Sequence, residues 1–294
     1  MQFVVYLIFY PLIWLISILP FPLLYLLSDF FYILIYRIIG YRKKTVRRNL
    51  LLAFPDKTAQ ERKEIEKKFY HHLCDIFLEM TKTLTISQSE MDKRYSFTNM
   101  EVYKEVEKQN KSIALLMAHY GSYEWAVSMN RHLNFTGFAI YKKIANQHFD
   151  KLVKGIRARF KAELITTKET IPTIQMNEDE GVRGVYGFAS DQSPKSSKAH
   201  HWGSFMGIET PVHTGAEMLA KRFDMNVMFL KTRKVKRGFY EGTFEILSLD
   251  ATSVPDYDLT DEFLRRVEVQ IRTAPEFYLW THKRWKHTRE SAVN

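Results

Sequence analysis

An uncharged apolar stretch opens the chain and constrains its fold more than any other feature. Met1 to Ser28 contains no acidic or basic side chain, and after Asp29 apolar residues continue to Ile39, interrupted by Arg37 and a few polar groups. About 20 apolar residues are enough for a helix to cross the core of a bilayer. The stretch is also dense in aromatic residues, among which Trp and Tyr favour membrane interfaces. It therefore predicts a membrane anchor.

Pro20 and Pro22 divide this stretch, since proline interrupts helical hydrogen bonding. We expect one helix over residues 3–19 and a second over 22–39. The cations that follow, between Arg37 and Arg48, favour a cytoplasmic flank and contact with anionic headgroups. A cleavable signal peptide is disfavoured because no basic region precedes the apolar run. The other alternative is a buried helix pair of a soluble protein. We predict an anchor over residues 1–40 and a catalytic domain over 41–294.

The composition of the chain limits which binding partners and which kinds of metal or disulfide site can be expected. The 294 residues carry a net charge of +10, which suits nucleic acid, an anionic membrane or an acidic carrier protein. Cys74 is the single cysteine, so no intrachain disulfide can form. His200, His201 and His213 have no carboxylate or cysteine at usual ligand spacing. We expect no metal and no cofactor.

Past the anchor, helical and strand patterns alternate. Thr58 and Glu61 form a capping box before a long amphipathic helix. Short apolar runs predict strands near 112–118, 138–141 and 184–189, and a hairpin over 226–247. Helices are expected near 147–160, 216–222 and 260–273, and an irregular stretch up to about His213. This order predicts an α/β fold, with a mostly parallel or mixed central sheet covered by helices.

One histidine stands where such a sheet would place a ligand site. His119 follows the apolar run that ends at Ala118, and Gly121 permits a tight turn after it. Glu124, in the first turn of the next predicted helix, would then lie near the imidazole. A carboxylate that orients a neutral imidazole makes it a general base toward a hydroxyl, which can attack a thioester. The alternative for an isolated histidine is a loop residue without a role.

The chain resembles the lipid A late acyltransferases, a branch of the lysophospholipid acyltransferase superfamily, whose signature H-x4-D/E matches His119 and Glu124. The resemblance runs through nearly the whole chain in order. It includes the basic segment after the anchor (residues 41–55), Tyr141-Lys142, Gly155 to Arg159, Asp191-Gln192, and the C-terminal segment Pro275 to Lys286. One departure lies beside the motif, where the family often has Gly-Asn-Trp-Glu and this chain has Gly-Ser-Tyr-Glu at 121–124.

The resemblance implies O-acyl transfer from acyl carrier protein, or from acyl-CoA, to a hydroxyl of a lipid A precursor. It also implies the bacterial inner membrane, with the catalytic domain on the cytoplasmic side. In this interpretation His119 is the base and Glu124 orients it. Arg157 and Asp191 match family positions near the active site, and Lys142 and Arg159 are further candidates for contact with phosphate. For each of these four, the alternative is an ordinary surface charge or turn residue.

Other functions stay open at this point. The acceptor can instead be a lysophospholipid, an aminolipid or a pigment. Water as acceptor would make the protein a thioester hydrolase. The aromatic and basic segment from Trp280 to Lys286 is also compatible with nucleic acid. The anchor upstream favours packing or a membrane interface for that segment, so no nucleic-acid partner is expected. A non-catalytic membrane scaffold is the remaining class.

Overall fold

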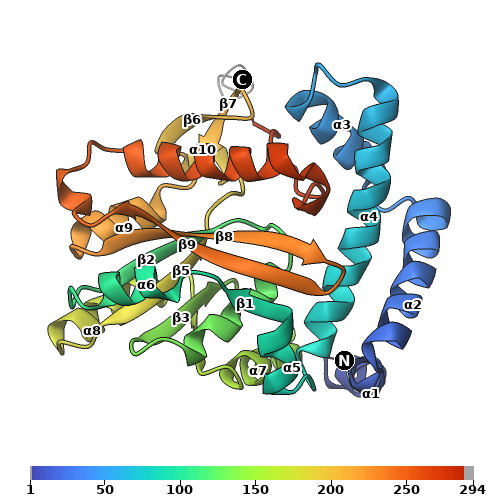
Figure 1. The fold of residues 1–294 in the computed structure, drawn as a ribbon, viewed down its shortest axis with the longest axis horizontal. Coiled ribbons are helices and arrows are strands. Elements are labelled where there is room, and N and C mark those ends of the chain that lie inside the picture. Colours follow the sequence, from blue (N-terminus) through green and yellow to red (C-terminus); the bar gives the residue numbers. More distant parts are fainter. Residues whose placement is uncertain (1, 288–294) are drawn as a thin grey trace.

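A computed structural model describes residues 2–287. The apolar start forms two helices, α1 (Gln2–Ile18) and α2 (Phe21–Tyr32), with a break at Leu19-Pro20 as predicted. The second continues as a π-helical segment, η1 (Ile33–Ile39), which ends at Gly40 in the left-handed conformation. Both helices pack against the long helix α4 (Ala59–Lys82) at one side of the molecule (Figure 1).

Helix ends in this region are capped by side chains. The capping box of Thr58 and Glu61 forms at the start of α4 as predicted, with each side chain bonded to the other residue's backbone N–H. At the end of α1, the Lys82 ammonium donates to the carbonyls of Ser17 and Leu19 at 2.8 and 2.7 Å. These carbonyls would otherwise lack intrahelical partners. The apolar segment is therefore joined to the rest of the chain by specific polar contacts.

The central sheet is mixed, as the sequence predicts, and has the order β1-β9-β8-β2-β5-β3-β4. Strands β8, β2, β5, β3 and β4 run parallel, whereas β9 is antiparallel to β8. The seven strands are β1 (Tyr95–Phe97), β2 (Ile113–Met117), β3 (Thr136–Tyr141), β4 (Ala162–Thr166), β5 (Gly184–Ala189), β8 (Asn226–Lys236) and β9 (Phe239–Ser248).

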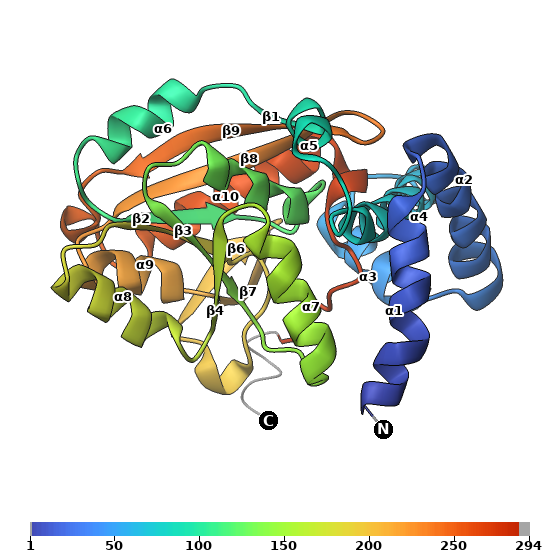
Figure 2. The same ribbon diagram turned by 90° about the horizontal axis from the view of Figure 1, so that it is seen from below.

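Alternate residues of the central strands enter two separate cores, because neighbouring side chains on a strand point to opposite faces. From β2, Ala114 and Leu116 join one core with α9 (Gly215–Arg222) and α10 (Asp258–Thr273). Ile113 and Leu115 join the other core with α5 (Gln88–Arg94) and α6 (Met100–Glu107). Figure 2 shows helices on both sides of the sheet. The remaining α-helices are α3 (Lys43–Ala53), α7 (Gln147–Ala158) and α8 (Thr170–Asp179).

The segment expected to be irregular up to His213 is partly ordered, and that expectation is wrong there. It contains a separate hairpin of β6 (His201–Phe205) and β7 (Ile208–Val212). Its two-residue turn, Met206-Gly207, has positive φ at both positions, 56° and 77°. Such turns usually carry Asn or Asp before Gly. Because Met occupies that position, the turn gives no clear signal in the sequence.

Candidate active site

Three adjacent parallel strands bring the candidate residues to one edge of the sheet. Strands β2, β5 and β3 are neighbours, and they are followed by His119, Asp191 and Lys142 respectively. The carboxyl ends of parallel strands form the usual ligand site of open α/β sheets. Residues far apart in the sequence therefore meet here because of the strand order.

The backbone after β2 is held in a tight turn by the C-terminal segment. Gly121 has a φ of 59°, and a Cβ atom there would lie 2.9 Å from the Thr232 side chain. The Gly121 N–H donates to the Phe277 carbonyl at 2.9 Å, and the Leu279 N–H donates to the His119 carbonyl at 3.1 Å. This pairing fixes the position of the His119 backbone. The positive φ and the nearby Thr232 side chain explain why residue 121 is a glycine.

His119 is paired with Asp191. Its Nδ1 lies 2.7 Å from Oδ1 of Asp191, and the same oxygen accepts the His119 backbone N–H at 3.1 Å. Burial opposes the charged imidazole, but the charge and hydrogen bond of Asp191, with a further contribution from Glu124, raise the pKa of His119. Burial likewise opposes the Asp191 carboxylate, yet the His119 charge and its hydrogen bonds lower the pKa of Asp191. The pair therefore favours an imidazole that readily accepts a proton on Nε2.

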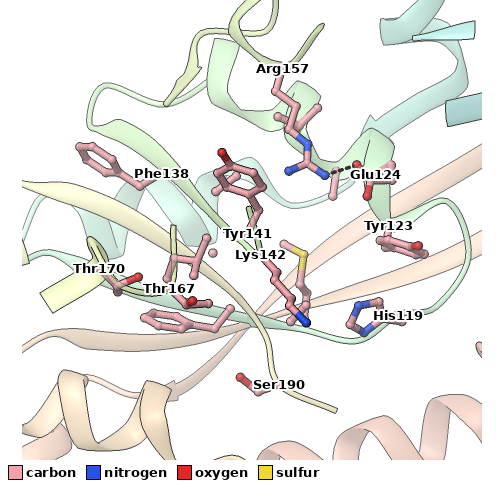
Figure 3. A pocket seen from close by; sticks show the side chains of 18 of the residues that line it. His119, Tyr123, Glu124, Phe138, Tyr141, Lys142, Arg157, Thr167, Thr170 and Ser190 are labelled. Atoms are coloured by element: carbon pink, nitrogen blue, oxygen red, sulfur yellow. Dashed lines mark hydrogen bonds and ion pairs between the residues drawn. The ribbon is translucent and has the colours of Figure 1, made fainter. Parts of the chain in front are cut away.

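Glu124 has a different partner from the one expected. It lies in the first turn of the 3₁₀ helix η2 (Tyr123–Arg131), and its carboxylate accepts from the Arg157 guanidinium of α7 at 2.6 Å (Figure 3). Both side chains are mostly buried. Glu124 is close enough for its charge to act on His119, but the hydrogen bond to the imidazole comes from Asp191. The turn at Gly121 directs Glu124 toward α7, while Asp191 follows the strand beside β2.

His119, Glu124 and Arg157 border one cavity of about 840 Å³. Its wall is largely apolar, and it includes Met117, Phe138, Ile140, Ile156, Ile171, Phe188 and Leu219. Figure 3 shows His119, Glu124 and Arg157 along one side of it. The Tyr123 ring meets the His119 ring edge to face, with centroids 5.0 Å apart. This volume is typical of small-molecule sites, and the combination of apolar walls with a few polar groups suits an acyl chain with a reactive end.

The two remaining cationic candidates, Lys142 and Arg159, lie in different places: one on this cavity and one outside it. Lys142 lines the cavity, and Figure 3 shows its side chain reaching toward the side on which His119 lies. Arg159 lies outside this cavity. Its guanidinium donates to the carbonyls of Thr83 at 2.7 Å and Ile86 at 2.8 Å, just after α4. These contacts hold Arg159 at the end of that helix and away from this cavity.

The sequence interpretation missed a supporting group behind Asp191. The His282 Nε2 accepts the backbone N–H of Ser193 at 3.2 Å, two residues after Asp191. Burial, which outweighs the opposing charge of Asp191, lowers the pKa of His282 to about 4, so the ring is neutral and accepts this bond. Arg284 is 1% exposed and donates to the Thr210 hydroxyl and the Pro211 carbonyl. The C-terminal segment thus packs beneath both His119 and Asp191.

Comparison with known proteins identifies the family of this chain. Residues 2–287 match the family described as bacterial lipid A biosynthesis acyltransferase. A lipid A biosynthesis lauroyltransferase of Escherichia coli (strain K12) is 26% identical over 285 residues, which cover 96% of this chain and 90% of that protein. A lipid A biosynthesis palmitoleoyltransferase of the same organism is 23% identical over 256 residues, which cover 83% and 79%. The chain belongs to the bacterial lipid A biosynthesis acyltransferase family, and it is an acyltransferase.

Proposed function

We propose that this protein transfers a fatty acyl chain from an acyl thioester to a hydroxyl group of a lipid A precursor or a similar glycolipid. The observation that carries the proposal is the 2.7 Å pairing of Asp191 with His119, which borders a large apolar cavity. The names of the relatives, a lauroyltransferase and a palmitoleoyltransferase of lipid A biosynthesis, point to the same class of donor chain and acceptor.

In the proposed reaction His119 is the general base. Its Nε2 removes the proton of the acceptor hydroxyl as the oxygen attacks the thioester carbonyl. The tetrahedral intermediate then expels the thiolate, to which the imidazolium returns the proton. Asp191 holds the tautomer and stabilises the imidazolium, as a triad carboxylate does. General-base catalysis of this kind contributes roughly 10²–10⁴-fold to the rate.

The second carboxylate acts on the same reaction through its charge and through Arg157. We assign Glu124 two effects: it adds negative charge near the imidazolium and it holds the guanidinium at the cavity wall. A guanidinium fixed there stabilises negative charge that develops on the carbonyl oxygen, or it binds a phosphate of the acceptor. Lys142, on the same cavity, is a second candidate for these anionic groups.

The surroundings of the site support a membrane location and an acidic donor. Helices α1 and α2 expose many large apolar side chains, among them Phe9, Leu12, Leu26 and Phe30. Exposed apolar surface of this extent is typical of membrane or protein interfaces. Since the acceptor is a lipid, we propose attachment to the bacterial inner membrane with the catalytic domain on the cytoplasmic side. The net charge of +10 suits acyl carrier protein, an acidic donor carrier, and it suits acyl-CoA and anionic lipids equally.

The test is acyl transfer in membranes that contain the wild type, His119→Ala or Glu124→Ala, with labelled acyl carrier protein thioester and total lipid A precursor. We expect the labelled lipid to fall by on the order of 10²–10⁴-fold with His119→Ala, and to fall with Glu124→Ala. His132→Ala, an exposed histidine replaced in the same way, is the matched control. Unchanged product with His119→Ala would refute the mechanism. Loss of the thioester without formation of acylated lipid would identify a hydrolase. The same assay with acyl-CoA in place of the acyl carrier protein thioester shows which of the two donors the enzyme uses.

A further inference from the structure

Helix α7 separates the active-site cavity from a second cleft. Val153, Ile156 and Arg157 face the active-site cavity. Lys151, Leu152, Gly155 and Arg159 line a separate cleft of about 410 Å³, and Ile156 borders both. These two sets of positions follow the helical repeat, so they lie on different faces of α7. One helix thus has the catalytic cavity on one side and an unassigned cleft on the other.

The second wall of the cleft is the apolar helix α1. Tyr6 of α1 lines the cleft, and its ring contacts Phe149 of α7 with centroids 5.4 Å apart. The Phe3 ring contacts the His148 ring, with centroids 5.1 Å apart. Figure 2 shows α1 running beside α7 at the edge of the molecule. The outward side chains of α1, including Val4, Leu7 and Ile8, are exposed. The cleft therefore adjoins the surface that we assign to the membrane.

The cleft combines apolar walls with positive charge. Leu84, Leu152 and Ile156 supply apolar surface. The Lys151 ammonium has no ion pair within residues 2–287, and the Arg159 guanidinium is bound to carbonyl groups rather than to a carboxylate. No carboxylate of the described residues lines the cleft. An apolar groove with unneutralised cations is complementary to a phosphorylated lipid: the acyl chain fits the groove and the phosphate pairs with the cations.

Gly155 indicates that the cleft is open space and not a packing gap. It lies inside α7, where glycine costs about 1 kcal/mol of helix stability relative to alanine. No atom lies within 4 Å of the position that a Cβ on Gly155 would occupy. A larger side chain therefore fits the fold and projects into the cleft. Local stability does not explain a glycine here, whereas room for a ligand beside the helix does.

We propose that the α1–α7 cleft binds the glycolipid acceptor, with one of its existing acyl chains along the groove and a phosphate at Lys151 and Arg159. The acceptor hydroxyl then reaches His119 past α7, whose Ile156 lies between the cleft and the cavity. This inference rests on the proposed function for the identity of the lipid. It assigns the acceptor's other chains a site apart from the cavity that holds the transferred acyl group.

The experiment measures binding without catalysis. The full-length chain carrying His119→Ala is titrated in mixed micelles with a radiolabelled, phosphorylated lipid A precursor and no donor. We expect Gly155→Phe to fill the groove and Lys151→Glu to repel the phosphate, each weakening binding by on the order of tenfold, a loss similar to that of one charge-assisted hydrogen bond. Gly155→Ala, which adds one methyl group and favours the helix, should bind nearly as the parent does.

The matched charge control is Lys104→Glu on α6, an exposed lysine outside the cleft. Binding unchanged by Gly155→Phe and Lys151→Glu, in protein with a normal melting temperature, would overturn the inference. So would equal displacement of the glycolipid by phosphatidylglycerol, since that would identify a general site for anionic lipids. Because the donor is absent, these outcomes are independent of whether transfer occurs. The proposed function fails separately, if the wild-type chain makes no acylated lipid.

Discussion

The two carboxylates near His119 act on it differently, and the pH dependence of the rate should separate them. Asp191 raises the pKa of His119 by charge and by a hydrogen bond, and Glu124 by charge alone. A raised pKa means that the neutral base becomes available only as the pH rises through that value. Asp191→Asn should therefore shift the acidic limb of kcat/KM to lower pH and reduce the plateau by on the order of 10²–10⁴-fold.

Glu124→Gln should shift the same limb in the same direction but by less. The pH profile of kcat/KM, measured for both variants with the same donor and acceptor, makes this comparison. A larger shift for Glu124→Gln than for Asp191→Asn would mean that Glu124, and not Asp191, is the residue that sets the basicity of His119. Because kcat/KM reports the groups of the free enzyme, that result would contradict the His119–Asp191 hydrogen bond as the main influence on the pKa of His119.

Arg157 and Glu124 should behave as one unit in catalysis. Each leaves a mostly buried charge unpaired when its partner is removed, and a buried unpaired charge is costly. Glu124→Gln and Arg157→Gln should each lower kcat/KM, and the double variant should lose less than the product of the two. A double-mutant cycle on kcat/KM measures this coupling. Strict additivity would show that the two side chains act independently.

At this scale the sequence points to His119 as the candidate base but does not predict that its imidazole pairs with Asp191. His119 stands out because an apolar strand ends directly before it and a glycine turn follows. Glu124 is the nearest carboxylate in the sequence, so it was the natural partner to predict. The strand order places β5 beside β2 and brings Asp191, 72 positions away, into contact instead. Local spacing does not contain that information, because it depends on which strands are neighbours.

Among the elements, the C-terminal segment should contribute stability that depends on pH through His282. The folded state lowers the pKa of His282 from about 6.5 to about 4. Between these values the unfolded chain binds a proton that the folded chain does not. The stability contributed by the neutral ring is therefore present above pH 6.5 and is lost as the pH falls toward 4.

His282→Leu should lower the free energy of unfolding at pH 7.5 by about 1–3 kcal/mol, because the buried N–H of Ser193 loses its acceptor. Its deficit relative to the wild type should shrink as the pH is lowered. His282→Gln, which retains an acceptor, should recover part of the stability without the pH dependence. Denaturant unfolding in detergent at several pH values gives these differences. A deficit for His282→Leu that does not change with pH would contradict the assignment of a neutral ring.

Elements with a strong repeating pattern were predicted well, and those defined by tertiary contacts were not. The break at Pro20, the capping box at Thr58 and the strand before His119 follow from local chemistry, and all three are present. The β6–β7 hairpin was missed because Met206 occupies a turn position that usually carries Asn or Asp. The support that His282 gives to Ser193 was missed because the two residues are 89 positions apart.

For the whole molecule, the proposed membrane attachment involves an apolar helix of spanning length. The segment Phe21–Ile39 is long and apolar enough to cross a bilayer. The inner face of its α2 part, however, is bound to the rest of the protein. The Ser28 hydroxyl donates to Asp75 of α4 at 2.8 Å, and Asp29 pairs with Arg237, which follows β8, at 2.6 Å. Its outer face is an apolar stripe at Leu23, Leu26, Phe30 and Ile33, whose spacing is that of one helix face.

A helix held in this way presents only its outer stripe to lipid, so we expect α2 to lie within one leaflet and not to cross the membrane. Single cysteines at Leu26 and Phe30, labelled with a fluorophore in proteoliposomes, should both be quenched most by shallow lipid-borne quenchers, within about 15 Å of the surface, half of a bilayer core. The native Cys74 does not interfere, because burial, with the nearby charge of Asp75, raises the pKa of its thiol to about 12. Placement of either label at the bilayer centre would mean that α2 has left α4. Such a placement would require the Asp29–Arg237 pair to break.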